Sequence, residues 1–373
     1  MRFKIFYLFF VILLTGCVRN EYIENMPVEK RMVITAYTDC EEDTKTTLDG
    51  EVGSVARKVL WDVKDSIGIV SQQGSSFNKF VNIQTEESIK GLFEGMYSGG
   101  SCYAVYPYNK NFKLQGTTIN LSLPEVQEYE ENSFGLNCSP MVARKSTDED
   151  LKFKNLCGVL VLRMTGNFSV KSITFTAKDS NGEYIRVSGG ATVDMAYIRT
   201  PELIMAADAS TKVVLDCNSG VQLNAAESVP FHIVLPVGTY NTFSVVVAST
   251  DGRIYIKEGT KPLTIKRSIA TKSSDFTPSE EQCIDLSLRG TSNCYIVSKR
   301  GAYSFDASVI GNGESGIIDK AIFHTDTPRI ELENAEILWV DKEPMISSVI
   351  LDNTNNRVSF FYNGDEGNGV IAL

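Results

Sequence analysis

The chain has 373 residues, of which 43% are hydrophobic and 22% are charged, and its formal net charge is −10. This length exceeds what one ordinary hydrophobic core accommodates, so we expect two or three globular domains. Because the chain is acidic and contains no block of basic residues, its composition argues against nucleic acid as a partner.

The N-terminus is typical of an export leader. Arg2 and Lys4 form a short basic region, and an apolar run follows it from Ile5 to Leu14. This run is about half as long as the roughly 20 residues that a membrane-spanning helix needs. The pattern therefore indicates a signal peptide rather than a stable span. No second apolar run in the sequence is long enough to cross a membrane.

The apolar run ends in Leu-Thr-Gly-Cys, residues 14–17, which matches the lipobox of bacterial lipoproteins. In such proteins the signal is cut before the cysteine, here between Gly16 and Cys17, and the thiol is lipidated. Residues 1–16 are thus predicted to be a lipoprotein signal peptide, and Cys17 is predicted to attach the protein to a membrane through lipid. Two or more acyl chains anchor stably, whereas one chain binds only marginally. The alternative is an ordinary signal peptide with a chance cysteine.

Residues 17–30 are polar and without periodicity, which indicates a tether. The first β-pattern follows at once in "RMVITAYT". Its alternation places Met32, Ile34 and Ala36 on one face of a strand and the intervening residues on the other.

Similar alternation recurs in "KSITFTAKD", "FHIVLPVGTY" and "TFSVVVASTDGRIYIKEG", where Asp251-Gly252 predicts a turn. In the first of these, Ile173, Phe175 and Ala177 share one face. Period-2 runs that are broken by Gly, Asn, Asp and Pro indicate antiparallel strands. No amphipathic stretch of three helical turns stands out, so we predict an all-β chain built from sandwiches.

Two polar segments suggest domain boundaries, a charged one at 144–152 and one rich in Ser, Thr, Pro and acidic residues at 271–282. They predict an N-terminal β-sandwich at 31–147, a second at 150–276 and a smaller C-terminal β domain at 284–373. The final strand, in "GNGVIAL", either completes this last domain or leaves it incomplete.

With Cys17 lipidated, seven cysteines remain, and an odd number cannot all pair. Cys157 and Cys217 lie in apolar runs and are expected to be small buried hydrophobes. Pairing of Cys283 with Cys294 stays open. No C-x-x-C occurs, so the sequence supports neither a zinc nor a redox motif.

No catalytic constellation stands out either. The only histidines, His232 and His324, lie in separate predicted domains without a nearby metal-ligating partner. No G-x-S-x-G nucleophile motif occurs. We therefore predict no catalytic residue, no cofactor and no metal site, and we do not expect an enzyme. His232 is expected to be the solvent-facing member of its strand.

The aromatic residues of "CYAVYPYNKNF" allow two interpretations. Exposed tyrosines would stack on sugar rings and suggest glycan binding. The interpretation that we favour is that Tyr106-Pro107-Tyr108 closes a strand and packs its turn into a core.

An ordered series of segments resembles a known family. "TKTTLDG", "VLWDVKDSIGIV", "GLFEGM" and "CYAVYPYN" are followed by "LKFKNLCGVLVLRMTG", "VSGGATVD" and "FHIVLPVGTYNTFSVVV". Together they resemble the fimbrillin-like surface lipoproteins of Bacteroides and its relatives, over about residues 40–270. The later stretch "CIDLSLRGTSNCYIVSKRGAYSF" resembles a segment found near the C-terminus of many surface proteins of this group.

The resemblance implies tandem transthyretin-like Greek-key β-sandwiches, attachment to the outer membrane at the cell surface, and a role in fimbriae. Its implied partners are other fimbrial subunits, joined by donor-strand exchange. In polymerising members a protease removes the N-terminal strand, and a strand of another subunit fills the groove. A missing strand leaves unpaired backbone groups beside an open core. An added strand pairs with these backbone groups and fills the core with its alternate side chains.

Carried over to this chain, the resemblance makes "MVITAYT", residues 32–38, the candidate removable strand. A trypsin-like cut would fall after it, at Lys45 or within Arg57-Lys58, but the interpretation that we favour is that these residues are ordinary loop charges. The third domain and the absence of an arginine directly after the strand favour an accessory, anchor or tip component over a stalk subunit. The alternative is a non-polymerising, membrane-tethered adhesin that binds host or dietary glycans.

Overall fold

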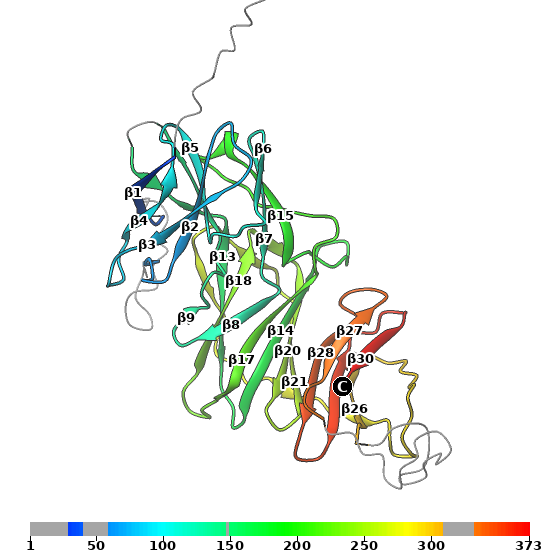
Figure 1. The fold of residues 1–373 in the computed structure, drawn as a ribbon. Helices are drawn as coiled ribbons and strands as arrows, with labels where there is room; N and C mark the ends of the chain where they lie inside the picture. Colours follow the sequence, from blue (N-terminus) through cyan, green and yellow to red (C-terminus); the bar gives the residue numbers. More distant parts are fainter. Residues whose placement is uncertain (1–28, 40–58, 147–148, 309–331) are drawn as a thin grey trace, which may run out of the picture.

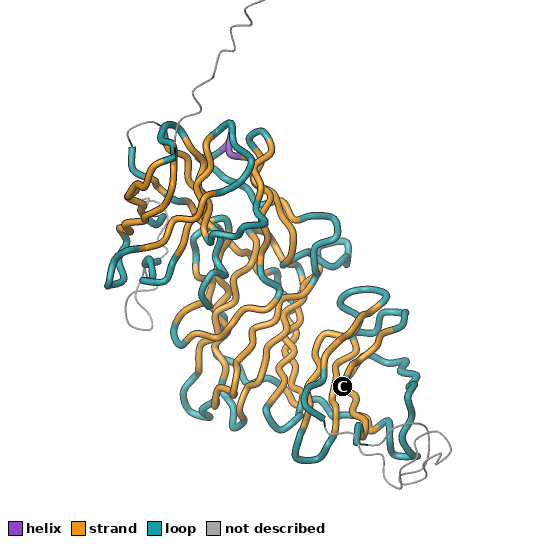
Figure 2. The backbone as a smooth tube through the Cα atoms, in the orientation of Figure 1, coloured by secondary structure: helices purple, strands orange, loops and turns teal. Residues whose placement is uncertain are grey.

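The computed structural model describes residues 29–39, 59–146, 149–308 and 332–373. These residues form strands and connecting loops, with one short 3-10 turn, Met195–Tyr197 (η1) (Figures 1 and 2). The predicted all-β sandwich class is confirmed. In this part of the chain, no helix has the length and apolar character that crossing a membrane requires.

The N-terminal unit is one eight-stranded sheet with the order β11-β1-β4-β3-β2-β5-β10-β12. Its strands are Lys30–Tyr37 (β1), Ser66–Ser71 (β2), Asn78–Asn82 (β3), Lys90–Tyr97 (β4), Cys102–Tyr106 (β5), Met141–Lys145 (β10), Leu151–Lys152 (β11) and Lys154–Asn155 (β12). The two edge strands, β11 and β12, are separated only by Phe153. The sheet therefore curls until its edges meet and encloses a core that includes Trp61, Phe80 and Phe93.

The second unit is a sandwich of two sheets. The sheet β18-β13-β23 faces the sheet β24-β21-β20-β14-β17-β8-β9. Its strands are Cys157–Met164 (β13), Ser169–Lys178 (β14), Lys212–Gln222 (β17), Val229–Pro236 (β18), Thr242–Ser249 (β20), Ile254–Gly259 (β21), Ala270–Lys272 (β23) and Ser279–Glu280 (β24), with Val126–Glu130 (β8) and Ser133–Phe134 (β9) added from earlier in the chain. Ile173, Phe175 and Ala177 of β14 are buried in its core, as their alternation predicted.

Strand pairing links the first two units. Thr118–Leu123 (β7) pairs antiparallel with Gly189–Asp194 (β15), and β8 pairs parallel with β17. Lys113–Gln115 (β6) and Ile204–Met205 (β16) flank the β7-β15 pair. A shared core of buried residues from both units lies between them, including Val105, Leu121 and Val159. The predicted division into three domains stays a prediction, and strand pairing crosses its first boundary at these points.

The C-terminal unit is a sheet with the order β25-β26-β29-β28 beside the ribbon β27-β30. The strands are Ile284–Asp285 (β25), Gly301–Asp306 (β26), Glu336–Val340 (β27), Ile346–Asp352 (β28), Arg357–Tyr362 (β29) and Gly369–Ala372 (β30). Ala302 and Phe361 pack against Val246, Ile254 and Ile256 of the sandwich. This unit covers part of the outer face of the β14-β20-β21 sheet, so that residues of this face such as Val246 and Ile254 are buried.

The structure also tests the predictions for four cysteines and for the turn at Asp251-Gly252. Cys157 and Cys217 are buried, as predicted, whereas Cys283 and Cys294 are both free and do not pair with each other. Gly252 lies in the predicted turn between β20 and β21 with φ of +81°, a left-handed conformation that glycine adopts without steric cost.

Candidate functional site

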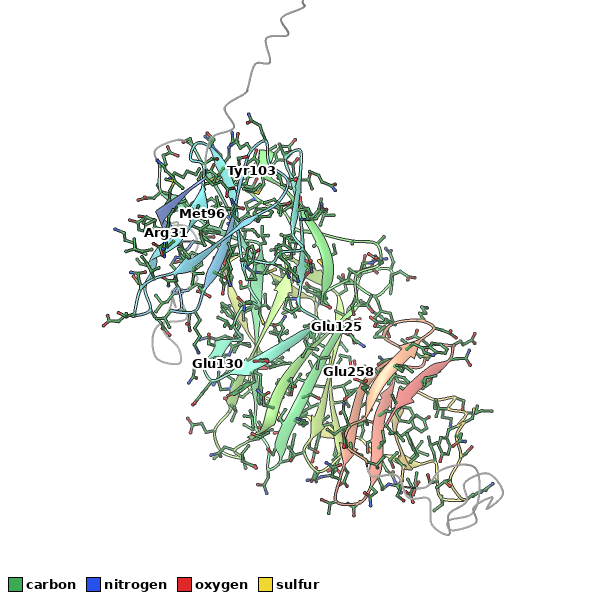
Figure 3. All side chains as sticks on the ribbon, in the orientation of Figure 1. Arg31, Met96, Tyr103, Glu125, Glu130 and Glu258 are labelled. Atoms are coloured by element: carbon green, nitrogen blue, oxygen red, sulfur yellow. The ribbon has the colours of Figure 1, made fainter. Side chains whose placement is uncertain are left out.

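The first strand is bound to the N-terminal sheet mainly along one side. All eight residues of β1 pair antiparallel with β4, from Lys30↔Tyr97 to Tyr37↔Lys90. On its other side, Ala36 and Tyr37 are the only residues that pair with another strand of the described part of the chain, namely with the two residues of β11. Arg31 and Met96, labelled in Figure 3, lie opposite each other in this β1–β4 pair. Over most of its length β1 therefore behaves as an edge strand.

The inward face of β1 completes the core of the N-terminal unit. Ile34 and Ala36 are buried, at 3% and 0% exposure, and Met32 packs against the same core from a half-buried position. Val33, on the opposite face, is 51% exposed. The alternation predicted from "RMVITAYT" is thus confirmed, and the strand fills its groove with two larger aliphatic side chains and one alanine rather than with an aromatic ring.

Two glycines of β4 make room beneath this strand. Gly91 lies opposite Ala36, and Gly95 lies opposite Met32. A Cβ atom on Gly91 would lie 2.4 Å from the Phe93 ring, and one on Gly95 would lie 2.6 Å from the Lys79 carbonyl oxygen. Any side chain at these positions would force ring or backbone to move, so glycine here permits the close packing of the groove floor.

Trp61 forms the floor of the groove. It is 1% exposed, and its Nε1 donates a hydrogen bond to the Ala36 carbonyl oxygen at 3.1 Å. Its ring packs edge-on against Phe93, Tyr106 and Phe153, with centroid separations of 5.0, 5.3 and 5.3 Å. The indole therefore contacts the strand through its N–H group and the core through T-shaped contacts with three aromatic rings.

A buried carboxylate lies close to this aromatic cluster. Asp65 is 3% exposed, and it accepts hydrogen bonds from the Tyr106 hydroxyl and the Asp62 backbone N–H, both at 2.8 Å. Burial raises the pKa of Asp65 to about 6, against the opposing effect of these hydrogen bonds. A cavity of about 440 Å³ lies alongside and is also lined by Glu87 and Glu130.

This raised pKa predicts a pH-dependent stability. Since the folded-state pKa of Asp65 lies above the unfolded value, its contribution to folding is fully present below about pH 4 and is lost as the pH rises through about 6. The free energy of unfolding of wild type should fall by roughly 3 kcal/mol over this window relative to Asp65→Asn. Urea titrations at pH 4 and pH 7 measure the difference. Glu86→Gln, at an exposed carboxylate, is the control and should follow wild type; an Asp65→Asn protein that also follows wild type contradicts the prediction.

The predicted processing sites all lie outside the described residues. This applies to Gly16 and Cys17 of the signal and lipid site, and to Lys45 and Arg57 of the maturation site. They stay predictions. Within the described part of the chain, no group of three or more His, Cys, Asp or Glu side chains is arranged to hold a metal ion.

The expectation for His232 is wrong. It is 4% exposed and lies in β18. The residues on either side of it, Phe231 and Ile233, face the core of the second sandwich, while Val234 faces the core shared with the first unit. Both faces of β18 are covered, so alternation along the strand did not reveal which residues meet solvent.

The aromatic cluster around Tyr106 belongs to the core. β5 ends at Tyr106, and Tyr103, Tyr106 and Phe112 are 4%, 7% and 5% exposed. This bears out the packing interpretation and removes these three side chains as a platform for sugars. Sequence reasoning did not single out Trp61, although it is one of only two tryptophans in the chain.

Neither a protein-family model nor a curated protein matches this sequence. Three solved structures from Bacteroides are similar in part. A proposed cell adhesion protein of Bacteroides uniformis is 12% identical, with a TM-score of 0.40, over 67% of this chain and 93% of that chain. A fimbrial protein of Bacteroides ovatus is 11% identical, with a TM-score of 0.28, over 65% and 49%. A proposed cell adhesion protein of Bacteroides fragilis is 11% identical, with a TM-score of 0.29, over 65% and 92%.

Proposed function

We propose that this chain is a lipid-anchored, fimbrillin-like protein of the bacterial cell surface, and an accessory, anchor or tip component of a fimbria assembled by β-strand exchange. The observation that carries the proposal is the position of β1. Among the described residues it is paired along its whole length with β4 and over only two residues with β11, and it closes an aromatic core with alternating aliphatic side chains.

Such a strand is suited to replacement. Removing β1 would leave β4 unpaired along the edge that now faces β1, while β3 still pairs with its other edge, and would open the core above Trp61 and Phe93. A strand from another subunit would restore the hydrogen bonds and fill the same positions with its alternate side chains. The period of two also sets the register, because a slip by one residue would turn the apolar side chains outward.

The leader and the lipobox support the location. Lipid on Cys17 would tether the uncut chain to the outer membrane, with residues 17–30 as a spacer to the folded part, and the cut that removes β1 would also remove this anchor. The proposal assigns the chain no catalysis, no cofactor and no metal. Its partners are other fimbrial subunits and the membrane, and not nucleic acid.

The C-terminal unit favours an accessory position over a stalk position. Its last strand, β30, pairs with β27 of the same unit, so it is already engaged within its own chain. A stalk subunit has to offer a strand to one neighbour while receiving a strand from another. An anchor or tip subunit needs only one of these two connections.

The test uses protein isolated from the surface of its own host. Strand exchange predicts a ladder of oligomers that survives SDS without boiling and collapses to a single band on heating. N-terminal sequencing should find a mature chain that begins after Lys45 or Arg57. A chain that still begins at lipidated Cys17 and runs as a monomer under all conditions would contradict assembly by exchange, and would favour the membrane-tethered adhesin instead.

A further inference from the structure

A buried polar network holds the end of the first strand. Asp39 follows β1 by two residues, and its side chain is 1% exposed. Its Oδ2 atom accepts hydrogen bonds from Arg267 Nη1 at 3.2 Å, from Ser268 Oγ at 2.9 Å and from the backbone N–H of Asn155 at 3.2 Å. The carboxylate therefore meets three donors, one of which is a charged guanidinium.

Two of these donors belong to a turn of the second sandwich. Arg267 and Ser268 lie between Leu263–Ile265 (β22) and β23, more than two hundred residues after Asp39 in the chain. The network thus joins the first strand to a part of the protein that folds around a different core.

The turn is held in place by contacts that do not involve β1. Ser268 has a φ of +60°, its N–H donates to the Cys157 carbonyl oxygen at 3.0 Å, and its Oγ accepts from Asn155 Nδ2 at 3.0 Å. Gly158 of β13 lets the turn approach, because a Cβ there would lie 2.3 Å from the Lys266 carbonyl oxygen. We call Asn155, Arg267 and Ser268 the carboxylate socket.

An unoccupied carboxylate socket would destabilise the protein, because it would leave the charge of Arg267 without its partner. The Arg267 side chain is only 20% exposed, and its guanidinium stays charged at any accessible pH. Removing one partner of a buried, hydrogen-bonded charge pair leaves the other charge uncompensated. If β1 leaves its groove, Asp39 leaves with it, and the socket loses the partner that the structure gives it.

We propose that the carboxylate socket selects the strand that replaces β1. An incoming strand must carry a carboxylate at the position of Asp39, three residues after the one that takes the place of Ala36 and five after the one that takes the place of Ile34. This inference rests on the proposed exchange of β1 and adds the chemistry of its partner. The partner strand is extended, apolar at alternate positions and acidic just beyond its last paired residue, which is the pattern that β1 itself has.

The socket also defines the register. A strand shifted by one residue would displace its carboxylate by about 3.3 Å and turn its apolar side chains to the wrong face. Apolar alternation alone is common among β-strands, so it discriminates poorly between partners. A buried charge requirement rejects a strand without the carboxylate much more strongly, since the mismatch leaves a desolvated cation unpaired.

The test uses the full chain with a specific protease site inserted between residues 40 and 58, cut only after folding, so that β1 stays bound without a covalent link. The cut protein is incubated with labelled peptide of the sequence KRMVITAYTD, residues 30–39, or with its Asp39→Asn form. We expect the acidic peptide to be retained at least about tenfold better. In an Arg267→Gln protein this preference should disappear, whereas in Arg199→Gln, at an exposed arginine between β15 and β16, it should persist.

The outcomes distinguish the exchange of β1 from the selection of the incoming strand by the carboxylate socket. Equal retention of both peptides overturns the socket as a selector and leaves strand exchange intact, and a preference that survives Arg267→Gln overturns the role of Arg267. If neither peptide enters, the proposed exchange of β1 is wrong, and so is the proposal that the socket selects the strand.

Should Arg267→Gln fail to fold, amide hydrogen exchange on intact Asp39→Asn protein takes the place of the peptide test. The β1 amides should then exchange about tenfold or more faster than in wild type with those of β14 unchanged, and an unaltered β1 would overturn the inference.

Discussion

Replacing Cys17 by serine should abolish lipid attachment and move the protein from the membrane fraction to the soluble fraction of its host. The cysteine thiol is the group that a lipobox presents for acylation, and the hydroxyl of serine does not substitute for it. Each buried methylene of an acyl chain contributes about 0.8 kcal/mol to membrane binding, so two or more chains make the difference close to all-or-none.

Fractionation followed by mass spectrometry of the N-terminal peptide measures this effect. Cys294→Ser is the matched control, because Cys294 is free and exposed in the C-terminal unit, and it should stay in the membrane fraction. A Cys17→Ser protein that remains membrane-bound and acylated would show that the lipobox interpretation is wrong. That outcome would leave the proposal for the β1 groove untouched, since the groove rests on the contacts of β1 with β4 and with Trp61.

Trp61→Ala should lower the free energy of unfolding by about 3–5 kcal/mol, the usual cost of removing a large buried aromatic side chain. The indole is fully enclosed, it packs on three rings, and it holds the Ala36 carbonyl of β1. Its loss leaves a cavity beneath β1 and removes a hydrogen bond from the strand. Amides of β1 should therefore exchange with solvent faster than those of the second sandwich.

Urea denaturation compares this variant with Trp339→Ala. Trp339 is the other tryptophan, and it is 47% exposed in β27, so its removal should cost no more than about 1 kcal/mol. Equal losses at the two positions would contradict the enclosed packing of Trp61. A milder loss in Trp61→Phe, which keeps an aromatic ring but not the N–H donor, would separate the ring contacts from the hydrogen bond.

The strands themselves were largely predictable from the sequence. "RMVITAYT" and "KSITFTAKD" became β1 and β14 with the expected residues in the core. A strand shows its period of two locally, within a few residues, so the pattern survives without knowledge of its neighbours. The same applies to the turn at Asp251-Gly252, which depends on the conformational freedom of one glycine.

The contacts that form the candidate site were not predictable in this way. Asp39 and Arg267 meet across 228 positions of sequence, and Trp61 reaches Ala36 across 25. Asp39 and Trp61 do not stand out in their own segments of sequence, because a single Asp or Trp produces no periodic pattern. His232 shows the related failure, since a second core covered the face that alternation had assigned to solvent.

The amino-acid sequence by itself predicted the leader and the lipid site at Cys17, and it determined the β-character of the chain and the apolar face of its first strand. These properties depend on short stretches, whose local composition and period are sufficient. Only the tertiary structure decided that β1 is paired chiefly on one side, that Trp61 lies beneath it, and that Asp39 is buried against Arg267. Each of these depends on which distant segments lie side by side, and sheet pairing brings such segments together only once the chain has folded.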